Sequence, residues 1–541
     1  MINRKYGVVY TPESLAEFTA QLIAGAAKEH SKTIKTVLDP ACGECALLSS
    51  AKVRFGESVE YWGIDVDADA VQNAQEGFHI IHNDSIMPQK VKRSTSEYWK
   101  SKLPPIDAII ANPPWSTEKI YDRTALSHAG FSLVNGQYDS YVLFLEFSYN
   151  LLVPEGIMAF IIPDSLFDTQ NAKLRQFLCE KTHICVIARL GEKIFDEVSR
   201  AATVIVCRKT SPNAESITRC FRLSTDARKE FLSGNKTLAS FYASDSHDVL
   251  QSRFALNEQF LFDIDTRADE EDLLSKIRSK SVSLSSVFIF GRGVEISKSG
   301  KIAICPKCRS AQGYKESQLQ TGQKKCSTCG IVFNFDANGI KNVISRESGK
   351  NCSEVFVGED LHRYRLSNGN YIELGIKGID YKNSNLYSPP KILIRKTGLG
   401  IYGAIDYSGS LATQTVYILK YACEFNSVPL EYYLALINSR VVYYYYLKTY
   451  GENEWKSHPY LTKQILFDLP IMPYTGSKTD NKIVEAAKEL MAGYNHPLDV
   501  KLEDLIMKKY LLNSEEKKMI YHEMDRLPDL SAINDMKKEE V

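Results

Sequence analysis

Four short apolar runs in the first 112 residues each end in an acidic or amide side chain, and this pattern constrains the fold most. The runs are TVLD, YWGID, FHIIHND and IDAIIAN, and they end at Asp39, Asp65, Asp84 and Asn112. Residues 45–55 and 68–76, which lie between them, can form helices. Strands that alternate with helices indicate an open, mostly parallel α/β sheet, which binds ligands beyond the carboxyl ends of its strands. We therefore predict a Rossmann-like α/β domain with one ligand site at the four strand ends.

The residue types at these strand ends are typical of a site for a nucleoside-like cofactor. The turn PACGEC after the first strand includes Gly43, which lets the backbone approach a ligand closely. The carboxylate of Asp65 could accept hydrogen bonds from two ribose hydroxyls. Any one of the four residues alone would more often be a helix cap or a turn residue. Four such residues at the ends of four successive strands favour a single ligand site.

The fourth strand leads into an unusual stretch, Asn112-Pro113-Pro114-Trp115. Two prolines exclude a helix and remove two backbone donors, and a residue before a proline is held extended. The result is a stiff run of carbonyl groups beside a flat ring. Dipoles fixed in this way can stabilise a reacting polar group. The alternative is a proline-stiffened loop with an exposed tryptophan.

The order of these motifs resembles the N6-adenine-specific DNA methyltransferases of the class in which the target-recognition domain comes last. The similar segments are GVVYTPESLAEF, LDPACGEC, GIDVD, NDS and NPPW. The resemblance covers residues 7–210 closely and 285–475 more loosely. It departs from the family pattern at Cys45, where Gly is frequent, and at Trp115, where Tyr or Phe is common.

The resemblance implies S-adenosyl-L-methionine as the cofactor. The cofactor-binding residues that it implies are Tyr10, Thr11 and Pro12 at the methionine end, Asp39, Pro40, Ala41 and Gly43 in the turn beneath the donor, Asp65 at the ribose, and Asp84 at the adenine amine. Thr11-Pro12-Glu13 is also a plain helix start, so its assignment depends most on the resemblance.

The resemblance also implies that the methyl group passes directly to the exocyclic amine of an adenine flipped out of duplex DNA. The side-chain oxygen of Asn112 and the carbonyl of Pro113 would accept the two amine hydrogens. Pro114 would stiffen the loop, and Trp115 would stack on the base. Phe195 matches a position where the family places a second ring against the adenine. A phenylalanine between two apolar strands is a core residue about as often.

The charges of the chain are unevenly distributed, although the net charge is zero. Residues 276–475 contain 26 Lys and Arg against 15 Asp and Glu, whereas the remainder contains 40 against 51. A basic segment attached to an acidic one suggests that one part binds nucleic acid. The alternative is a chance segregation of surface charge.

The basic segment has short β-rich runs separated by Gly and Asn, and it resembles a target-recognition domain. The candidate contacts to phosphates or guanine edges are Arg363, Lys391, Arg395 and Lys396. The tyrosine run 443–446 is predicted to pack in a core and not to form a base-stacking surface.

Two CxxC pairs lie inside this segment. They are Cys305 with Cys308 and Cys326 with Cys329, and the spacing predicts a structural zinc ribbon over residues 301–332. Disulfides or unliganded thiols are the alternative. We find neither an export signal nor an apolar run long enough to cross a bilayer. We therefore expect a cytoplasmic, nucleoid-associated prokaryotic protein with no membrane partner.

We predict a methyltransferase domain at 1–235, connecting helices at 236–285, a target-recognition domain at 286–475 and a helical tail at 476–541. The predicted function is site-specific adenine-N6 methylation of double-stranded DNA in restriction–modification or phage defence. Any restriction endonuclease or other defence subunit would then be a separate protein. The alternatives are an RNA or protein-glutamine N-methyltransferase, or a non-catalytic DNA-binding subunit of a defence complex.

Overall fold

The computed structural model consists of two compact units, one formed by residues up to Asp269 and the other by residues from Glu270 onward. We call them unit 1 and unit 2 and describe each by itself. The structure describes residues 11–72, 77–88, 94–115, 121–133, 139–195, 200–296, 300–314, 322–336, 339–367, 369–422, 427–451, 460–527 and 533–537. The domain limits predicted from the sequence stay predictions.

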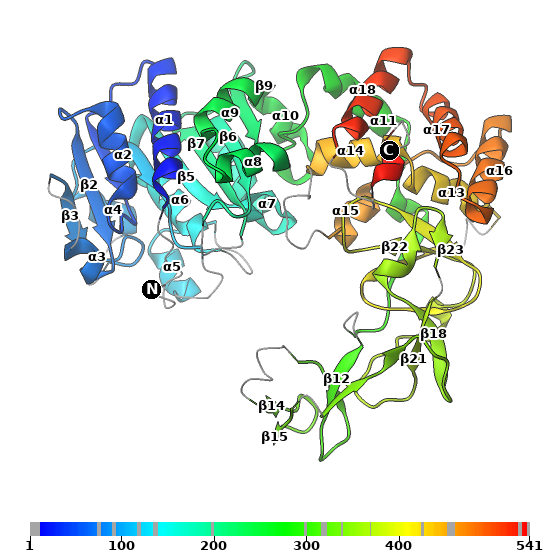
Figure 1. Ribbon diagram of the computed structural model, residues 1–541. Coiled ribbons are helices and arrows are strands. Elements are labelled where there is room, and N and C mark those ends of the chain that lie inside the picture. Colours follow the sequence, from blue (N-terminus) through cyan, green and yellow to red (C-terminus); the bar gives the residue numbers. More distant parts are fainter. Residues whose placement is uncertain are drawn as a thin grey trace. The chain divides into compact units, whose positions relative to one another are not determined.

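Unit 1 is built around one large sheet (Figure 1). In the described part of the chain this sheet has nine strands, in the order β3-β2-β1-β4-β5-β7-β6-β8-β9. The strands are β1 (Thr36–Asp39), β2 (Glu60–Asp65), β3 (His79–His82), β4 (Ile106–Ala111), β5 (Leu152–Pro163), β6 (His183–Gly191), β7 (Ala202–Arg208), β8 (Ile217–Arg222) and β9 (His247–Leu250). β1 to β5 are parallel to their neighbours among these five strands, and β7 is antiparallel to β5 and β6. The predicted α/β sheet is confirmed.

Helices cover both faces of this sheet because its strands are apolar on both sides. Along β5, Ile157, Ala159 and Ile161 belong to one core cluster, and the alternate residues Met158, Phe160 and Ile162 belong to another. The first cluster includes α1 (Glu13–Glu29), α2 (Ala46–Phe55), α8 (Thr225–Leu232) and α9 (Leu238–Asp245). The second includes α4 (Thr95–Lys100), α5 (Arg123–His128), α6 (Tyr141–Leu151), α7 (Ala172–Lys181) and α10 (Gln251–Leu256). Helix α3 (Ala68–Gln72) lies between β2 and β3 in the chain.

The strand order reverses between β1 and β4, because β2 and β3 continue from β1 in one direction and β5 continues from β4 in the other. Loops after adjacent strands diverge at such a switch point and leave a crevice at the carboxyl edge of the sheet. The four strand ends picked out in the sequence belong to β1, β2, β3 and β4. The topology therefore brings them to one crevice.

Unit 2 combines small β-sheets with a helical core (Figure 1). Its strands are β10 (Val282–Ser283), β11 (Phe288–Arg292), β12 (Lys301–Ile304), β13 (Ala311–Gln312), β14 (Gln323–Lys325), β15 (Val332–Asn334), β16 (Ile340–Asn342), β17 (Ile344–Ser345), β18 (Cys352–Phe356), β19 (Leu361–His362), β20 (Arg365–Leu366), β21 (Asn370–Glu373), β22 (Lys391–Arg395), β23 (Gly403–Asp406), β24 (Leu411–Ala412), β25 (Val416–Tyr421) and β26 (Pro470–Ile471). The two largest described sheets have the orders β11-β25-β22-β23 and β17-β21-β18-β24. The predicted β-rich character of this part of the chain is confirmed.

The described α-helices of unit 2 share one hydrophobic cluster. They are α11 (Glu271–Ser279), α13 (Leu430–Ile437), α14 (Arg440–Tyr450), α15 (Lys463–Asp468), α16 (Lys478–Ala492), α17 (His496–Lys509) and α18 (Ser514–Asp525). Ser439, Ser477, Asn495 and Asn513 precede α14, α16, α17 and α18, and each side chain accepts a hydrogen bond from a backbone N–H in the first turn. The run Tyr443–Tyr446 in α14 is buried in the cluster, as predicted.

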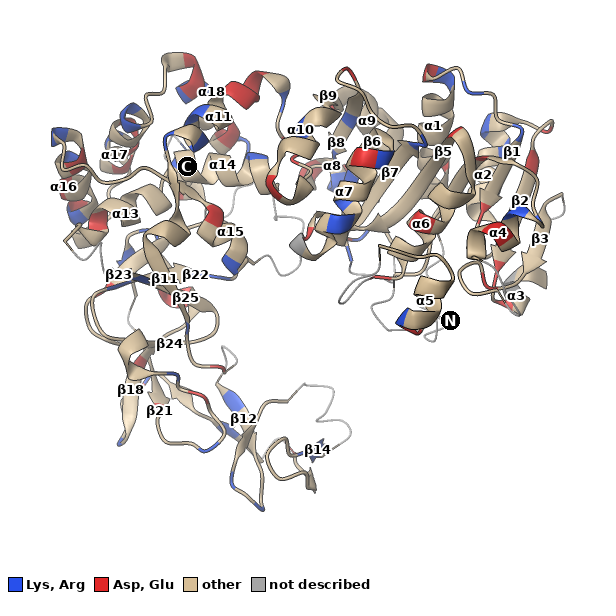
Figure 2. Ribbon diagram, turned by 180° about the vertical axis from the view of Figure 1, so that it is seen from behind, with Lys and Arg blue, Asp and Glu red and all other residues tan. Residues whose placement is uncertain are grey.

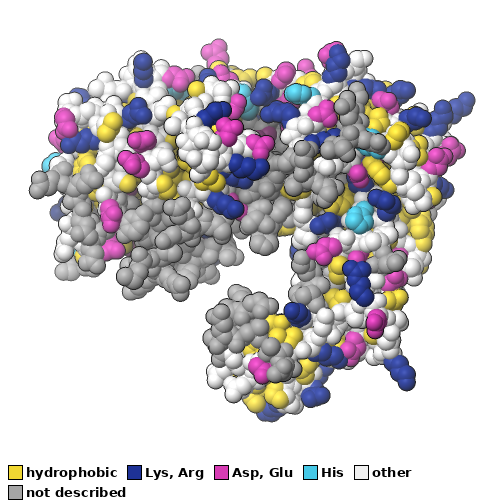
Figure 3. Space-filling model, in the orientation of Figure 1, with side chains coloured by type: hydrophobic (Ala, Val, Ile, Leu, Met, Phe, Trp, Pro, Cys, Tyr) yellow, Lys and Arg dark blue, Asp and Glu magenta, His cyan; other side chains and the backbone are white. Residues whose placement is uncertain are grey.

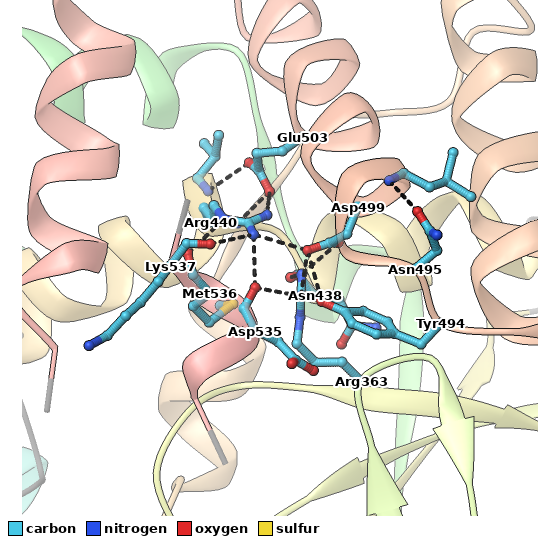
Figure 4. A network of polar contacts seen from close by, with 12 residues as sticks. Arg363, Asn438, Arg440, Tyr494, Asn495, Asp499, Glu503, Asp535, Met536 and Lys537 are labelled. Carbon is cyan, nitrogen blue, oxygen red and sulfur yellow. Dashed lines mark hydrogen bonds and ion pairs between the residues drawn. The ribbon is translucent and has the colours of Figure 1, made fainter. Parts of the chain in front are cut away.

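A buried network of charges joins the helices of unit 2 to its β-rich part (Figure 4). Arg363 donates to both carboxylate oxygens of Asp499, at 2.7 and 3.0 Å. Arg440 contacts Asp499 at 3.0 Å, and its backbone N–H donates to Glu503 at 2.8 Å. Because the four charges compensate one another, they can be buried together at α17.

This network corrects one prediction from the sequence, and a second ion pair corrects another. Arg363 was predicted to contact DNA, but its side chain is 1% exposed beside Asp499. Lys391 was predicted to do the same, but it is 0% exposed and pairs with Asp406. A buried cation that already has its own carboxylate has no surface left for a phosphate. Both predictions of DNA contact are therefore wrong for this structure.

No helix among the described residues is both long and apolar enough to cross a membrane.

Candidate active site

The carboxyl edge of the sheet in unit 1 encloses a cavity of about 260 Å³. The residues predicted from the sequence that line it are Thr11, Asp39, Pro40, Ala41, Gly43, Asp65, Asp84, Asn112 and Pro114. Pro12, Pro113, Trp115 and Phe195 are not among its lining residues, and Tyr10 lies outside the described residues. The structure thus brings most of the predicted site together from four strands and the start of α1.

The carboxylate of Asp65 fixes the turn that follows β1. Its two oxygens accept hydrogen bonds from the backbone N–H groups of Gly43 and Asp67, both at 2.8 Å. Gly43 has a φ of +47°, a left-handed conformation that glycine adopts at little cost. Gly63 in β2 is also required, because a Cβ there would lie 2.7 Å from the sulfur of Cys42. The floor of the cavity is therefore held by backbone geometry as well as by side chains.

Asp84 is held from both sides. One of its oxygens accepts from the backbone N–H groups of Ile86 and Met87, at 2.8 and 3.0 Å. The other accepts from the hydroxyl of Tyr121 at 2.8 Å. These contacts fix the carboxylate at the end of β3, where it lines the cavity.

The lining of the cavity is acidic. Asp39, Glu44, Asp65 and Asp84 all contribute to it, and Asp39 is buried. Burial, together with the charge of nearby Asp65, raises the pKa of Asp39 to about 8, against a smaller opposing effect of the Ala41 N–H. A cationic ligand would relieve this unfavourable burial of carboxylates. The electrostatics of the cavity therefore favour a ligand that carries positive charge.

The Asn-Pro-Pro-Trp loop is anchored at three points. The side-chain N–H of Asn112 donates to the hydroxyl of Thr11 at 3.0 Å, and the Ser140 hydroxyl donates to the carbonyl of Pro114. Arg200 donates to the carbonyl of Trp115 at 2.9 Å and pairs with the buried Asp139 at 2.8 Å. These bonds hold the loop with Asn112 and Pro114 on the cavity wall.

Trp115 packs away from the cavity lining in this structure. Its indole N–H donates to the carbonyl of Ile161 at 3.3 Å, and its ring meets that of Phe195 edge to face with centroids 5.2 Å apart. Phe195 is buried and belongs to the same core cluster that Trp115 packs against. The two aromatic rings predicted at the target base are therefore neighbours.

Several residues of the cavity and of its supporting contacts were not predicted from the sequence. Ser85 directly follows Asp84 and donates to the carbonyl of Pro40 at 2.6 Å, so its position next to a strand end was a usable signal. Tyr121, Ser140 and Arg200 lie in loops or at a helix start, without a periodic pattern that would mark them.

The four cysteines of the predicted ribbon lie together in unit 2. The sulfur atoms of Cys305 and Cys329 are 3.7 Å apart, those of Cys308 and Cys326 are 3.6 Å apart, and all four lie within 4.8 Å of one another. The backbone N–H groups of Thr328 and Cys329 point at the sulfur of Cys326, at 3.4 and 3.5 Å. Four sulfurs at this spacing, supported by N–H groups, can hold a tetrahedral metal ion.

Basic side chains are spread over the β-rich part of unit 2 (Figures 2 and 3). Arg395 is half-buried and donates to the carbonyl of Thr397 at 2.6 Å and to the hydroxyl of Tyr402 at 2.9 Å. Lys396 beside it is also half-buried, and burial together with the charge of Arg292 lowers its pKa. Among the described residues close in sequence to the cysteines, Lys301, Lys307, Arg309 and Lys325 are exposed.

Comparison with known families matches one domain in each half of the chain. The profile of the N-6 DNA Methylase family matches residues 2–265. The first half of the chain belongs to the N-6 DNA methylase family. The N-6 DNA methylase domain is followed by a match to the TaqI-like C-terminal specificity domain, over residues 353–471. The resemblance predicted from the sequence is confirmed, because the two domains occur in the expected order.

Two type II methyltransferases are similar to part of this chain. M.AccI of Acinetobacter calcoaceticus is 31% identical over 213 residues, which are 38% of this chain and 37% of M.AccI. M.BanIII of Aneurinibacillus aneurinilyticus is 30% identical over 216 residues, which are 36% of this chain and 37% of M.BanIII. The chain therefore spans little more than a third of the length of either relative.

Two solved structures resemble the fold of nearly the whole chain. The ATP-dependent Type ISP restriction-modification enzyme LlaBIII bound to DNA matches 91% of this chain and 39% of its own, with 14% identity and a TM-score of 0.52. The DrdV–DNA complex matches 90% of this chain and 57% of its own, with 11% identity and a TM-score of 0.50. At these identities the likeness describes the fold alone.

Proposed function

We propose that this chain is a site-specific DNA methyltransferase that transfers a methyl group from S-adenosyl-L-methionine to N6 of a flipped-out adenine, in restriction–modification or phage defence. The observation that carries the proposal is the cavity at the switch point of the sheet. Three strand-end carboxylates and Asn112 line it together. The N-6 DNA methylase profile over the same residues supports the reaction class.

The residues of the cavity fit S-adenosyl-L-methionine. This cofactor carries a sulfonium and an ammonium group, and the acidic lining suits both. Asp65 would accept from the ribose hydroxyls, and Asp84 from the adenine amine of the cofactor. Thr11 and Pro12 would lie near the methionine end, with Asp39 to Gly43 beneath it. When bound, the cofactor supplies an electrophilic methyl group on sulfur.

The Asn-Pro-Pro-Trp loop would then activate the base. The side-chain oxygen of Asn112 and the carbonyl of Pro113 would each accept one amine hydrogen of adenine, which directs the nitrogen lone pair at the methyl group. Thr11 supports this because it binds the side-chain N–H of Asn112 and so orients the amide. The new bond joins nitrogen to the methyl carbon, the sulfur–carbon bond breaks, and the amine loses a proton to solvent. The half-buried Trp115 would stack on the flipped base, and Phe195 would support its ring from the core unless it turns out toward the base.

The second half of the chain supports duplex DNA as the substrate. It contains the match to a specificity domain and carries the excess of Lys and Arg. Of the predicted contacts, Arg395 and Lys396 remain candidates because they are partly exposed. An RNA or protein-glutamine methyltransferase would not need a DNA specificity domain. A non-catalytic subunit would not need an anchored Asn112.

Replacement of Asn112 tests the chemistry. Asn112→Ala should abolish methyl transfer to a plasmid library and leave the affinity for the cofactor nearly unchanged, because Asn112 binds the amine and not the donor. Asp65→Ala should weaken cofactor binding first. Calorimetry measures binding, and transfer of a tritiated methyl group measures activity. Substantial activity of Asn112→Ala would refute its role.

The choice of base and substrate needs a separate experiment. Host DNA sequenced for modified bases with and without the gene should reveal one adenine motif that depends on the chain. Asp226→Asn, an exposed change on α8, should leave that motif intact. If the chain methylates RNA or protein and leaves host DNA unmodified, an RNA or protein-glutamine methyltransferase is favoured instead.

We also propose that the four ribbon cysteines bind one structural Zn²⁺. Cys305, Cys308, Cys326 and Cys329 provide the tetrahedral sulfur set that zinc prefers. Elemental analysis of Cys326→Ser should show loss of that ion, and proteolysis should cut the ribbon faster. Cys352→Ser, a free cysteine elsewhere in unit 2, is the matched control. A wild-type ribbon that stays protease-resistant after its metal is removed would contradict the proposal.

A further inference from the structure

His30, His183 and Cys185 lie together at the edge of the sheet opposite the cavity. His30 caps the carboxyl end of α1, whose other end begins beside Thr11 on the cavity wall. A helix of 17 residues is about 25 Å long. His183 and Cys185 flank Ile184 at the start of β6, where the pairing with β7 is irregular between Ile184 and Val186, and their ligand atoms lie within 4.8 Å of each other. The trio therefore belongs to a different site from the cavity.

The three side chains have the spacing of metal ligands. One ligand atom from each lies within 4.8 Å of the other two. Nε2 of His30 is 3.6 Å from the sulfur of Cys185. Nitrogen and sulfur ligands at about 2.0 and 2.3 Å from a tetrahedral zinc ion lie about 3.5 Å apart. This pair is therefore already at ligand spacing, as are the ribbon sulfurs at 3.6 and 3.7 Å.

A backbone contact orients His183 for such a role. Its Nε2 lies 2.9 Å from the carbonyl of Ile217, and a carbonyl can only accept, so Nε2 carries the proton. Nδ1 then has the lone pair. A histidine ligand commonly donates its other ring N–H to a carbonyl, which fixes the tautomer and the orientation of the ring.

Charged groups beside the trio act in opposite directions. The guanidinium of Arg208 lies 3.5 Å from Nδ1 of His30 and can only donate, so this contact favours the tautomer with the proton on Nε2 and also disfavours a second cation. Zinc bound through Nε2 of His30 therefore requires Arg208 to turn away and the proton to move to Nδ1. Glu155 pairs with Arg208 and offsets that charge. His30 is half-buried, whereas His183 and Cys185 are almost fully buried, so a metal ion would enter from the side of His30.

We propose that His30, His183 and Cys185 bind one Zn²⁺ through Nε2, Nδ1 and Sγ, with water as the fourth ligand. Binding would release the thiol proton of Cys185 to solvent and leave two neutral imidazoles and one thiolate on the ion. The ion would tie the end of α1 to β6. Its distance from the cavity assigns it a structural role. The competing arrangement is a hydrogen-bond relay from Arg208 through His30 to Cys185, with no metal.

Metal counting on the full chain tests the proposal independently of methyl transfer. Chains purified in Zn²⁺ and analysed by elemental analysis should hold about one ion more than His30→Ala or Cys185→Ser chains. Cobalt(II) in place of zinc should give a thiolate charge-transfer band that Cys185→Ser diminishes. Cys179→Ser, a buried cysteine outside both clusters, is the control. His30→Ala changes a half-buried cap position, so it separates loss of metal from loss of folding, which circular dichroism monitors.

The variant Arg208→Gln should raise the affinity for zinc, whereas His30→Ala and Cys185→Ser should lower it. It removes the cation beside Nδ1 of His30 and frees Glu155, so zinc should bind about tenfold tighter. A relay without metal predicts no such gain. Equal metal content in wild type, His30→Ala and Cys185→Ser, or weaker binding by Arg208→Gln, would overturn the proposal.

Discussion

The side chain of Asp39 is buried, so its carboxyl group is almost out of contact with water. Its pKa rises from 3.8 to about 8 on folding, because burial and the nearby charge of Asp65 disfavour the ionised form. The folded chain therefore holds a proton that the unfolded chain has released at neutral pH. The contribution of Asp39 to stability is fully present below pH 3.8 and is lost as the pH rises through about 8.

A cationic ligand should stabilise the ionised form of Asp39 over the protonated form. S-adenosyl-L-methionine favours the ionised form of Asp39, so its binding at pH 7 should release a proton, and its affinity should rise as the pH approaches 8. Calorimetry in two buffers of different ionisation enthalpy measures the released proton. Asp39→Asn should abolish the release, and the exposed change Asp226→Asn should not. Equal release from Asp39→Asn and wild type would show that another group supplies the proton.

Helix α17 presents two acidic residues in contrasting environments. Asp499 is buried between Arg363 and Arg440, whereas Asp504 is 49% exposed and pairs with Lys517 at 3.3 Å. Burial alone would raise the pKa of Asp499, but the two arginines together lower it. Its stabilising contribution is therefore present at neutral pH and is lost as the pH falls into the acid range.

Asp499→Asn should lower the free energy of unfolding of unit 2 by about 3–5 kcal/mol, because it leaves two buried arginines without their shared carboxylate. Asp504→Asn on the same helix should change it by about 0.5 kcal/mol or less. Chemical denaturation followed by tyrosine fluorescence, which is concentrated in unit 2 around α13 and α14, measures both. Similar losses for the two variants would mean that burial of the network is not what stabilises α17.

At the scale of the whole molecule, cofactor and DNA should bind to different units. Residues 1–269 form one compact unit that contains the cavity, and the specificity-domain match lies entirely in the other unit. A chain of residues 1–269 should therefore bind S-adenosyl-L-methionine like the full chain but bind no cognate duplex. Binding of the full chain should weaken steeply with salt as counterions are released. If residues 1–269 bind the cognate duplex as well as the full chain does, the proposal that cofactor and DNA bind to different units is wrong.

Arg395→Ala in the full chain refines that prediction. If Arg395 reads a base, its loss should relax the site at one position and cost about 1–3 kcal/mol. If it binds a phosphate, all sequences should weaken alike. Competition with a library of duplexes distinguishes the two, and Lys382→Ala, a surface lysine paired with Glu295 and Asp380, is the control.

Sequence reasoning succeeded where the pattern was local and failed where a contact joined residues far apart in the chain. Asp39, Asp65, Asp84 and Asn112 could be grouped because each follows an apolar strand, and parallel strands end at one edge. Arg363 was misassigned because its partner Asp499 is 136 positions away, and no local pattern reveals a buried ion pair of that range. Trp115 was placed on the loop but not against Ile161, for the same reason.

The late acceptors of one buried arginine side chain, Arg440, bear on the order of folding during synthesis. Arg440 donates to the carbonyls of Asp535, Met536 and Lys537, which follow it by 95 to 97 positions. Until these residues leave the ribosome, the guanidinium of Arg440 has Asp499 and Glu503 but lacks these three carbonyls, and the core of unit 2 is incomplete. In unit 1 the buried Arg175 likewise donates to the carbonyls of Gln259 and Phe260, 84 and 85 positions later, but these acceptors belong to unit 1 itself. Unit 1 can therefore fold while unit 2 is still being translated. Unit 1 would thus be folded before unit 2, which is proposed to recognise the DNA sequence, has been fully translated.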